Sequence, residues 1–142
     1  MVICAGMIVA LAIPAPTAAG VPQFQGRDRD GGTVSFKVKV WHGHFKKVAA
    51  GFAWKNLDVD CHQGWSQTDG SFTRRMRVRH GRFHGTGRTD TAGGVVIAKV
   101  SGRFARHGNR ARGKIRVRGN FNAGATSCDT GRDRWRAHRG AA

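Results

Sequence analysis

Val34-Ser35-Phe36-Lys37-Val38-Lys39-Val40 alternates apolar and polar residues along its whole length. Successive side chains of a β-strand point to opposite faces, so one face of this segment suits a core and the other suits solvent. The segment that reads KIRVRGNF, residues 114–121, repeats the pattern with arginine in place of most lysines. Both segments therefore predict half-buried strands.

Seven further segments extend this reading along the chain: residues 23–29, 48–54, 57–61, 72–78, 82–88, 96–104 and 132–138. Glycine turns separate them, and such short connections favour antiparallel neighbours. Glutamate is absent and leucine is rare after the first 19 residues, so strong helix formers are few. The sequence predicts an all-β fold, an antiparallel up-and-down meander of about eight or nine short strands. It leaves open whether they close as a small barrel or fold as a two-layer sandwich.

The N-terminus has the composition of a signal peptide. Residues 1–13 are apolar and uncharged, and small residues follow up to Gly20. We expect residues 1–19 to be removed and residues 20–142 to form one domain that is secreted or held in the cell envelope. An uncleaved N-terminal anchor is the alternative.

Export would leave two cysteines, Cys61 and Cys128, in an oxidising compartment, where they are expected to form one disulfide. A metal site is the alternative, although the two cysteines lack the Cys-x-x-Cys spacing typical of zinc ligands.

Several short motifs resemble those of a group of uncharacterised, small, secreted bacterial all-β proteins. The motifs are Cys61-His62-Gln63-Gly64, Gly81-Arg82-Phe83, the segment ARGKIRV at residues 111–117, and Cys128-Asp129-Thr130-Gly131 followed by Trp135-Arg136-Ala137. The resemblance covers most of the chain after residue 19. It implies export, the cysteine pair and an all-β fold, and it implies no activity.

The formal net charge is +17, and it raises the question of an anionic partner. Arginine and lysine alternate with core residues, so they are expected on the outward faces of the strands. If two such strands are neighbours, their like charges repel unless an anion or an aspartate lies between them. An anionic polymer or an anionic lipid surface is the expected partner, and the exposed candidates are Arg75, Arg77, Arg79, Lys114, Arg116 and Arg118. The phenylalanines fall on core faces, which argues against specific nucleic-acid recognition. A GC-rich genome would also enrich arginine without any partner.

Other candidate sites are weaker. His42 and His44 flank a glycine and are the best metal-ligand candidates, but a third ligand is missing. Asp58 and Asp60 alternate on one face, where salt bridges to arginine are expected rather than acid–base catalysis. Trp41 and Trp65 lie beside turns and are expected to rim a pocket, whereas Trp54 and Trp135 are expected in the core.

No cofactor is predicted, and a monomer is expected. The leading hypothesis is therefore a non-catalytic exported domain with a basic binding face. A small-ligand carrier barrel is second, and a hydrolase whose site is assembled only in space is third.

Overall fold

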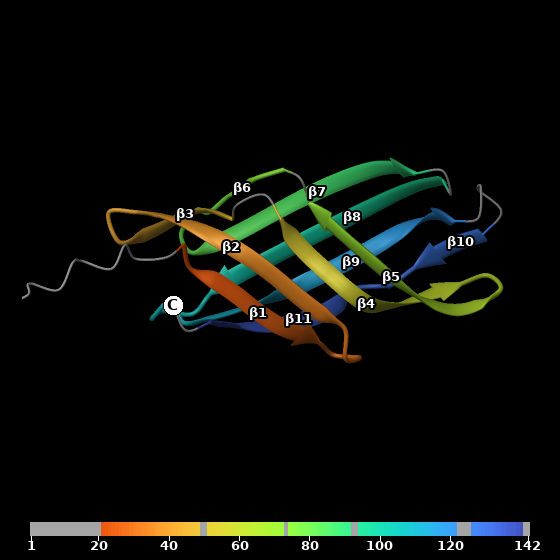
Figure 1. Cartoon of the computed structure of the whole chain (residues 1–142), viewed down its shortest axis with the longest axis horizontal. Coiled ribbons are helices and arrows are strands. Elements are labelled where there is room, and N and C mark those ends of the chain that lie inside the picture. Colours follow the sequence, from red (N-terminus) through yellow and green to blue (C-terminus); the bar gives the residue numbers. More distant parts are fainter. Residues whose placement is uncertain (1–20, 49–50, 73, 92–93, 122–125, 141–142) are drawn as a thin grey trace, which may run out of the picture.

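The computed structural model describes residues 21–48, 51–72, 74–91, 94–121 and 126–140, and the expected signal peptide lies outside them. These residues form eleven strands (Figure 1). In chain order the strands are β1 (Gln23–Asp28), β2 (Thr33–Trp41), β3 (His44–Val48), β4 (Phe52–Cys61), β5 (Gly64–Phe72), β6 (Met76–Arg77), β7 (Arg82–Thr91), β8 (Gly94–Phe104), β9 (Arg110–Phe121), β10 (Thr126–Asp129) and β11 (Asp133–Arg139).

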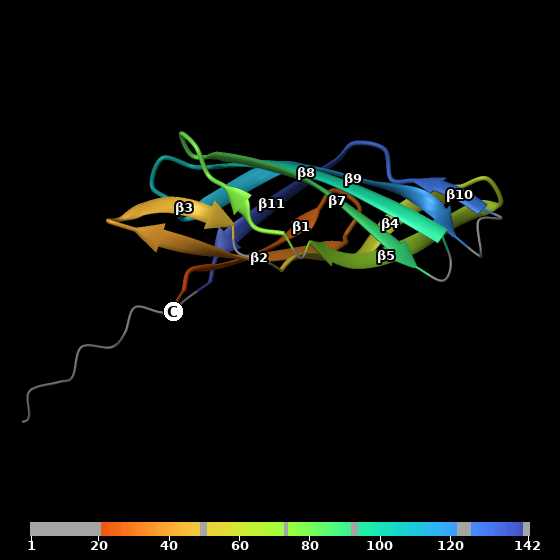
Figure 2. The ribbon, with the colours of Figure 1, turned by 90° about the horizontal axis from the view of Figure 1, so that it is seen from above.

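All strand pairs are antiparallel, and they close on themselves. One circuit runs β4–β10–β9–β11–β1–β2 and back to β4. A second runs β1–β2–β3–β6 and, through an isolated bridge between Arg79 and Arg82, on to β7–β8–β9–β11. The fold is thus all-β, as the alternation predicted, and of the two closures that the sequence left open the strands form a barrel. Figure 2 shows that the barrel is flattened into two layers, with β2 and β5 in one and β7, β8 and β9 in the other.

The barrel interior is filled by aromatic rings. Phe36 on β2 lies at the centre, with ring centroids 5.1 Å from Phe24, 5.2 Å from Phe52 and 5.7 Å from Trp135. Glycine makes this packing possible, because a Cβ on Gly113 would overlap the carbonyl oxygen of Ser101 and lie 2.5 Å from the Trp135 ring. Trp54 and Trp135 are core residues, as expected.

The disulfide joins two neighbouring strands of the barrel that are far apart in the sequence. Cys61 at the end of β4 lies directly opposite Cys128 on β10, with a Cα–Cα distance of 4.0 Å, and the two residues are joined. The prediction of one Cys61–Cys128 disulfide is confirmed.

Some strand boundaries differ from the expected ones. The segment expected at residues 72–78 is divided: Phe72 ends β5, and β6 covers only Met76 and Arg77. The segment expected at residues 57–61 is the second half of β4, which is continuous through a bulge near Asn56, a residue with a φ of 53°. β5 was not expected, because side chains 64–67 are exposed on both of its faces and give no alternation.

Candidate functional site

The outer face of the barrel carries a row of arginines in register. Arg79 lies opposite Arg82, and the row continues through Arg103, Arg112 and Arg136 to Arg27. We call these six residues the arginine ladder. Partners in antiparallel strands are 4.5–5.5 Å apart at Cα, so the ladder extends for about 25 Å across the strands. All six side chains are exposed.

No carboxylate interrupts the ladder. Among the described residues, the ion pairs involve other arginines, Arg29 with Asp30 and Arg116 with Asp129. Like charges directly opposite each other in a sheet are destabilising, and two unit charges about 5 Å apart in water repel by about 0.8 kcal/mol. The ladder therefore concentrates positive charge that the protein itself leaves uncompensated.

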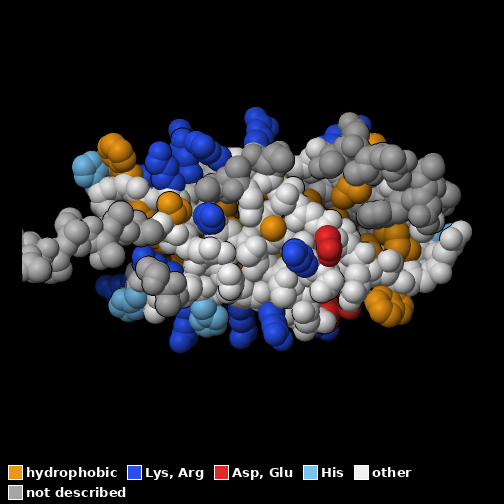
Figure 3. Space-filling view, viewed as in Figure 1, with side chains coloured by type: hydrophobic (Ala, Val, Ile, Leu, Met, Phe, Trp, Pro, Cys, Tyr) orange, Lys and Arg blue, Asp and Glu red, His pale blue; other side chains and the backbone are white. Residues whose placement is uncertain are grey.

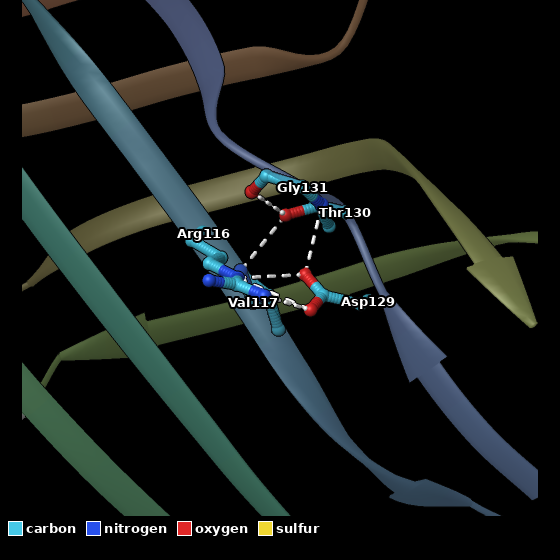
Figure 4. A network of polar contacts seen from close by, with 5 residues as sticks. All are labelled: Arg116, Val117, Asp129, Thr130 and Gly131. Carbon is cyan, nitrogen blue, oxygen red and sulfur yellow. Dashed lines mark hydrogen bonds and ion pairs between the residues drawn. The ribbon is translucent and has the colours of Figure 1, made fainter.

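The stripe Lys114, Arg116 and Arg118 lies on the same outer face of β9, beside Arg112. Lys114 lies opposite Arg134 and adds to the positive face. Arg116 instead forms a two-pronged ion pair with Asp129, with its Nε 3.0 and 3.1 Å from the two carboxylate oxygens (Figure 4). These bonds hold the pKa of Asp129 below its usual value and raise the pKa of Arg116. The charge of Arg116 is thus already partly neutralised.

The other predicted stripe is separated by the fold. Arg75 lies in the connection before β6, Arg77 lies on β6, and Arg79 is the first member of the ladder. The two stripes are not on neighbouring strands, because β6 pairs with β3 and β9 pairs with β8, β10 and β11. Each stripe nevertheless has a cation opposite it on another strand: Lys47 lies opposite Arg77, and Arg134 lies opposite Lys114. The sequence alone could not identify these strands as neighbours.

Arg77 belongs to a second in-register row. It lies opposite Lys47 on β3, which lies opposite Lys39 on β2. Lysine and arginine side chains gather over β3 and β6, and others project along the lower margin beside β1 and β11 (Figure 3). Lys47, Arg79 and Arg112 lie outside the expected strands, and the other residues of the two rows lie within them. The alignment of each row depends on register, which alternation alone does not give.

An open hollow of about 520 Å³ lies beside this second row. It is lined by Lys39, Trp41, Lys46, Lys47, Arg77 and Val78. A smaller hollow of about 260 Å³ lies at the disulfide and is lined in part by Trp65 and Gln67. Trp41 and Trp65 therefore each line a hollow at the barrel exterior, as their positions beside turns suggested.

The remaining candidates are not brought into a site. His42 and His44 are exposed at the β2–β3 turn, and the described residues contain no cluster of three histidine, cysteine or acidic side chains suited to a metal. Asp58 accepts a hydrogen bond from Gln67 at 3.1 Å, and neither Asp58 nor Asp60 forms an ion pair with a described arginine.

One pair of carboxyl groups was not among the candidates predicted from the sequence. Asp28 at the end of β1 and Asp133 at the start of β11 are both buried, although aspartate at a strand end is usually exposed. Burial, together with the neighbouring carboxylate of Asp28, raises the pKa of Asp133 to about 6. A proton on Asp133 would relieve the repulsion between the two carboxyl groups.

The described residues include no helix long and apolar enough to cross a membrane. Comparisons with family models, curated proteins and solved structures found no match. The resemblance to small secreted bacterial proteins therefore stays a prediction.

Proposed function

We propose that this protein is an exported, non-catalytic domain that binds a linear anionic polymer across its arginine ladder. One observation carries the proposal: six arginines lie in register on neighbouring strands, with no carboxylate among them. A polymer with regularly spaced phosphate, sulfate or carboxylate groups would place negative charge between these like charges.

Arginine suits this role because its planar guanidinium forms paired hydrogen bonds to carboxylates and phosphates. Binding would release counterions from the polymer, so affinity should fall steeply with salt. Lys114 and Arg134, which lie opposite each other beside the ladder, would widen the contact.

The interior of the barrel favours this surface over the carrier alternative. Phe24, Phe36 and Phe52 stack in sequence through the core, with centroids 5.1 and 5.2 Å apart, and Trp135 fills the space beside them. Barrels of about eight strands have interiors that side chains can fill. Both hollows lie on the exterior of the barrel, and polar or charged side chains form much of their linings.

The test is a salt titration with heparin and with inorganic polyphosphate. The double variant R103Q/R112Q removes two charges from the middle of the ladder. The control R74Q/R132Q removes two exposed charges from connections between strands. We expect the ladder variant to lower affinity and to reduce the slope of log K against log salt by about 1.5, because each polyanion contact contributes about 0.7–0.9.

The control should change the slope much less. Equal losses in the two variants would show that net charge, and not the ladder, determines binding. If the wild-type protein ignores both polymers at low salt, the proposal is wrong. The intact mass of exported protein tests the export component separately, since it reports both removal of residues 1–19 and the cystine.

A further inference from the structure

We infer that the larger hollow, beside the row Lys39, Lys47 and Arg77, binds an unpaired nucleic-acid strand, with one base stacked on Trp41. This inference rests on the proposed function, because the ladder supplies the general attraction for polyanions. It adds the class of polymer, which the ladder alone does not select.

The hollow combines an exposed aromatic ring with several cations. Trp41 is 60% exposed, and the four charged residues of the lining, Lys39, Lys46, Lys47 and Arg77, are all basic. Stacking of a base on an aromatic side chain contributes about 1–3 kcal/mol and is independent of sequence, since every base has a π-face. Sequence reasoning argued against nucleic acid because the phenylalanines face the core; Trp41 supplies the exposed ring that was missing.

A β-bulge builds this arrangement. Val40 lies opposite Phe45 and Lys39 lies opposite Lys47, so Lys46 is an extra residue with no partner in β2. Such a bulge lets two successive residues of one strand face a single residue of its neighbour. Lys46 and Lys47 therefore both border the hollow. The carbonyl of Lys46 accepts a hydrogen bond from the backbone N–H of Val78 at 2.8 Å, which fixes the buried floor of the hollow.

The indole is in contact with a neighbouring ring before any ligand binds. The ring of His42 lies against that of Trp41, with centroids 4.9 Å apart and planes at 87°. A restrained side chain loses less conformational freedom on binding than a free one, so more of the stacking energy appears as affinity.

The hollow and the ladder are two residues apart along one segment of the chain. Arg77 borders the hollow and Arg79 begins the ladder, and both are exposed on either side of buried Val78. A phosphate backbone that follows the ladder would thus reach Lys47 and Lys39 at its end. The base must be unpaired, because the faces of bases in a duplex are covered by their neighbours.

A membrane surface fits this end of the barrel less well. The turn beyond Trp41 is His42-Gly43-His44, with both imidazoles exposed, so a bilayer would have to accept two polar side chains before the indole. Base stacking needs only the exposed ring and the adjacent cations.

The experiment compares a short oligothymidylate with an abasic oligomer that has the same phosphate backbone. The variant is W41A, and its matched control is W65A, which removes a tryptophan that is 74% exposed at the other hollow. We expect W41A to weaken oligothymidylate binding by about 5- to 150-fold and to leave abasic binding unchanged. W41F should retain part of the affinity, and W65A should retain nearly all of it.

The ladder variant R103Q/R112Q separates the two proposals, because it should weaken both oligomers alike. If the wild-type protein binds both oligomers equally and W41A has no effect, stacking is wrong while polyanion binding survives. If neither oligomer nor heparin binds at low salt, both proposals fail. If heparin or phosphatidylglycerol vesicles change the tryptophan fluorescence of the wild-type protein but not that of W41F, and oligothymidylate changes neither, the hollow takes a saccharide or a membrane and the inference is overturned.

Discussion

Replacing Asp133 with asparagine should stabilise the protein at neutral pH and have little effect at acidic pH. Asp133 is 7% exposed, and its Oδ1 accepts a hydrogen bond from the backbone N–H of Arg134 at 2.8 Å, which an asparagine oxygen can also accept. The nearby Asp28 Oδ2 is buried, with no hydrogen-bond partner among the described residues. An asparagine Nδ2 would offer it a donor without a proton being taken up.

The magnitude follows from the pKa. Burial and Asp28 raise the pKa of Asp133 from 3.8 to about 6. The folded protein therefore retains a proton that the unfolded chain releases, so this stabilising contribution is complete below about pH 4 and is lost as pH rises through about 6. One pKa unit corresponds to 1.36 kcal/mol, which sets an upper limit of about 3 kcal/mol above pH 7. Because the asparagine that replaces Asp133 is itself a polar side chain that must be buried, only part of this limit is recovered, and we expect D133N to gain about 1–2 kcal/mol there.

The assay is urea unfolding of the wild-type protein, of D133N and of D60N at about pH 4 and at about pH 8. Asp60 is an exposed carboxyl group on β4, so its replacement controls for the loss of one negative charge in a basic protein. The reasoning is refuted if D133N is no more stable than the wild type at the higher pH, or if its gain is the same at both pH values.

Two other perturbations test the fold. Removing the disulfide with C61S/C128S should lower the free energy of unfolding by about 4 kcal/mol, because the bond closes a loop of 67 residues; an unchanged urea midpoint would contradict this. G113A should cost at least about 2 kcal/mol, since its Cβ would meet the Ser101 carbonyl oxygen and the Trp135 ring. G140A is its control, because a Cβ there comes no closer than 3.7 Å to another atom, and equal thermal shifts in both variants would show that the close approach is not what matters.

Alternation was enough to predict which side chains of single strands face the core. Val34, Phe36 and Val38 are buried, and Lys37 and Lys39 are exposed, as their positions required. The pairing of Cys61 with Cys128 followed from their number and from the expected export. These inferences succeed because each depends on local sequence or on the small number of available partners.

The candidate surface depends on relations that local sequence does not contain. Arg27 and Arg136 lie opposite each other because β1 pairs with β11, and the sequence of neither strand indicates which strand is its partner. The bulge that brings Lys46 beside Lys47 interrupts the alternation on which the sequence reading relied. Asp28 and Asp133 likewise become neighbours only through the pairing of β1 with β11.

The pairing of β1 with β11 also has a consequence for folding. Phe24 lies opposite Arg139, so the first and last strands of the described chain are hydrogen-bonded neighbours. A chain still emerging from a ribosome or a translocation pore lacks the strand that completes the barrel, and contacts between such distant residues slow folding. Until β11 is available, β1 keeps an unpaired edge whose N–H and C=O groups can pair with another chain. The risk of aggregation is therefore greatest before β11 pairs with β1.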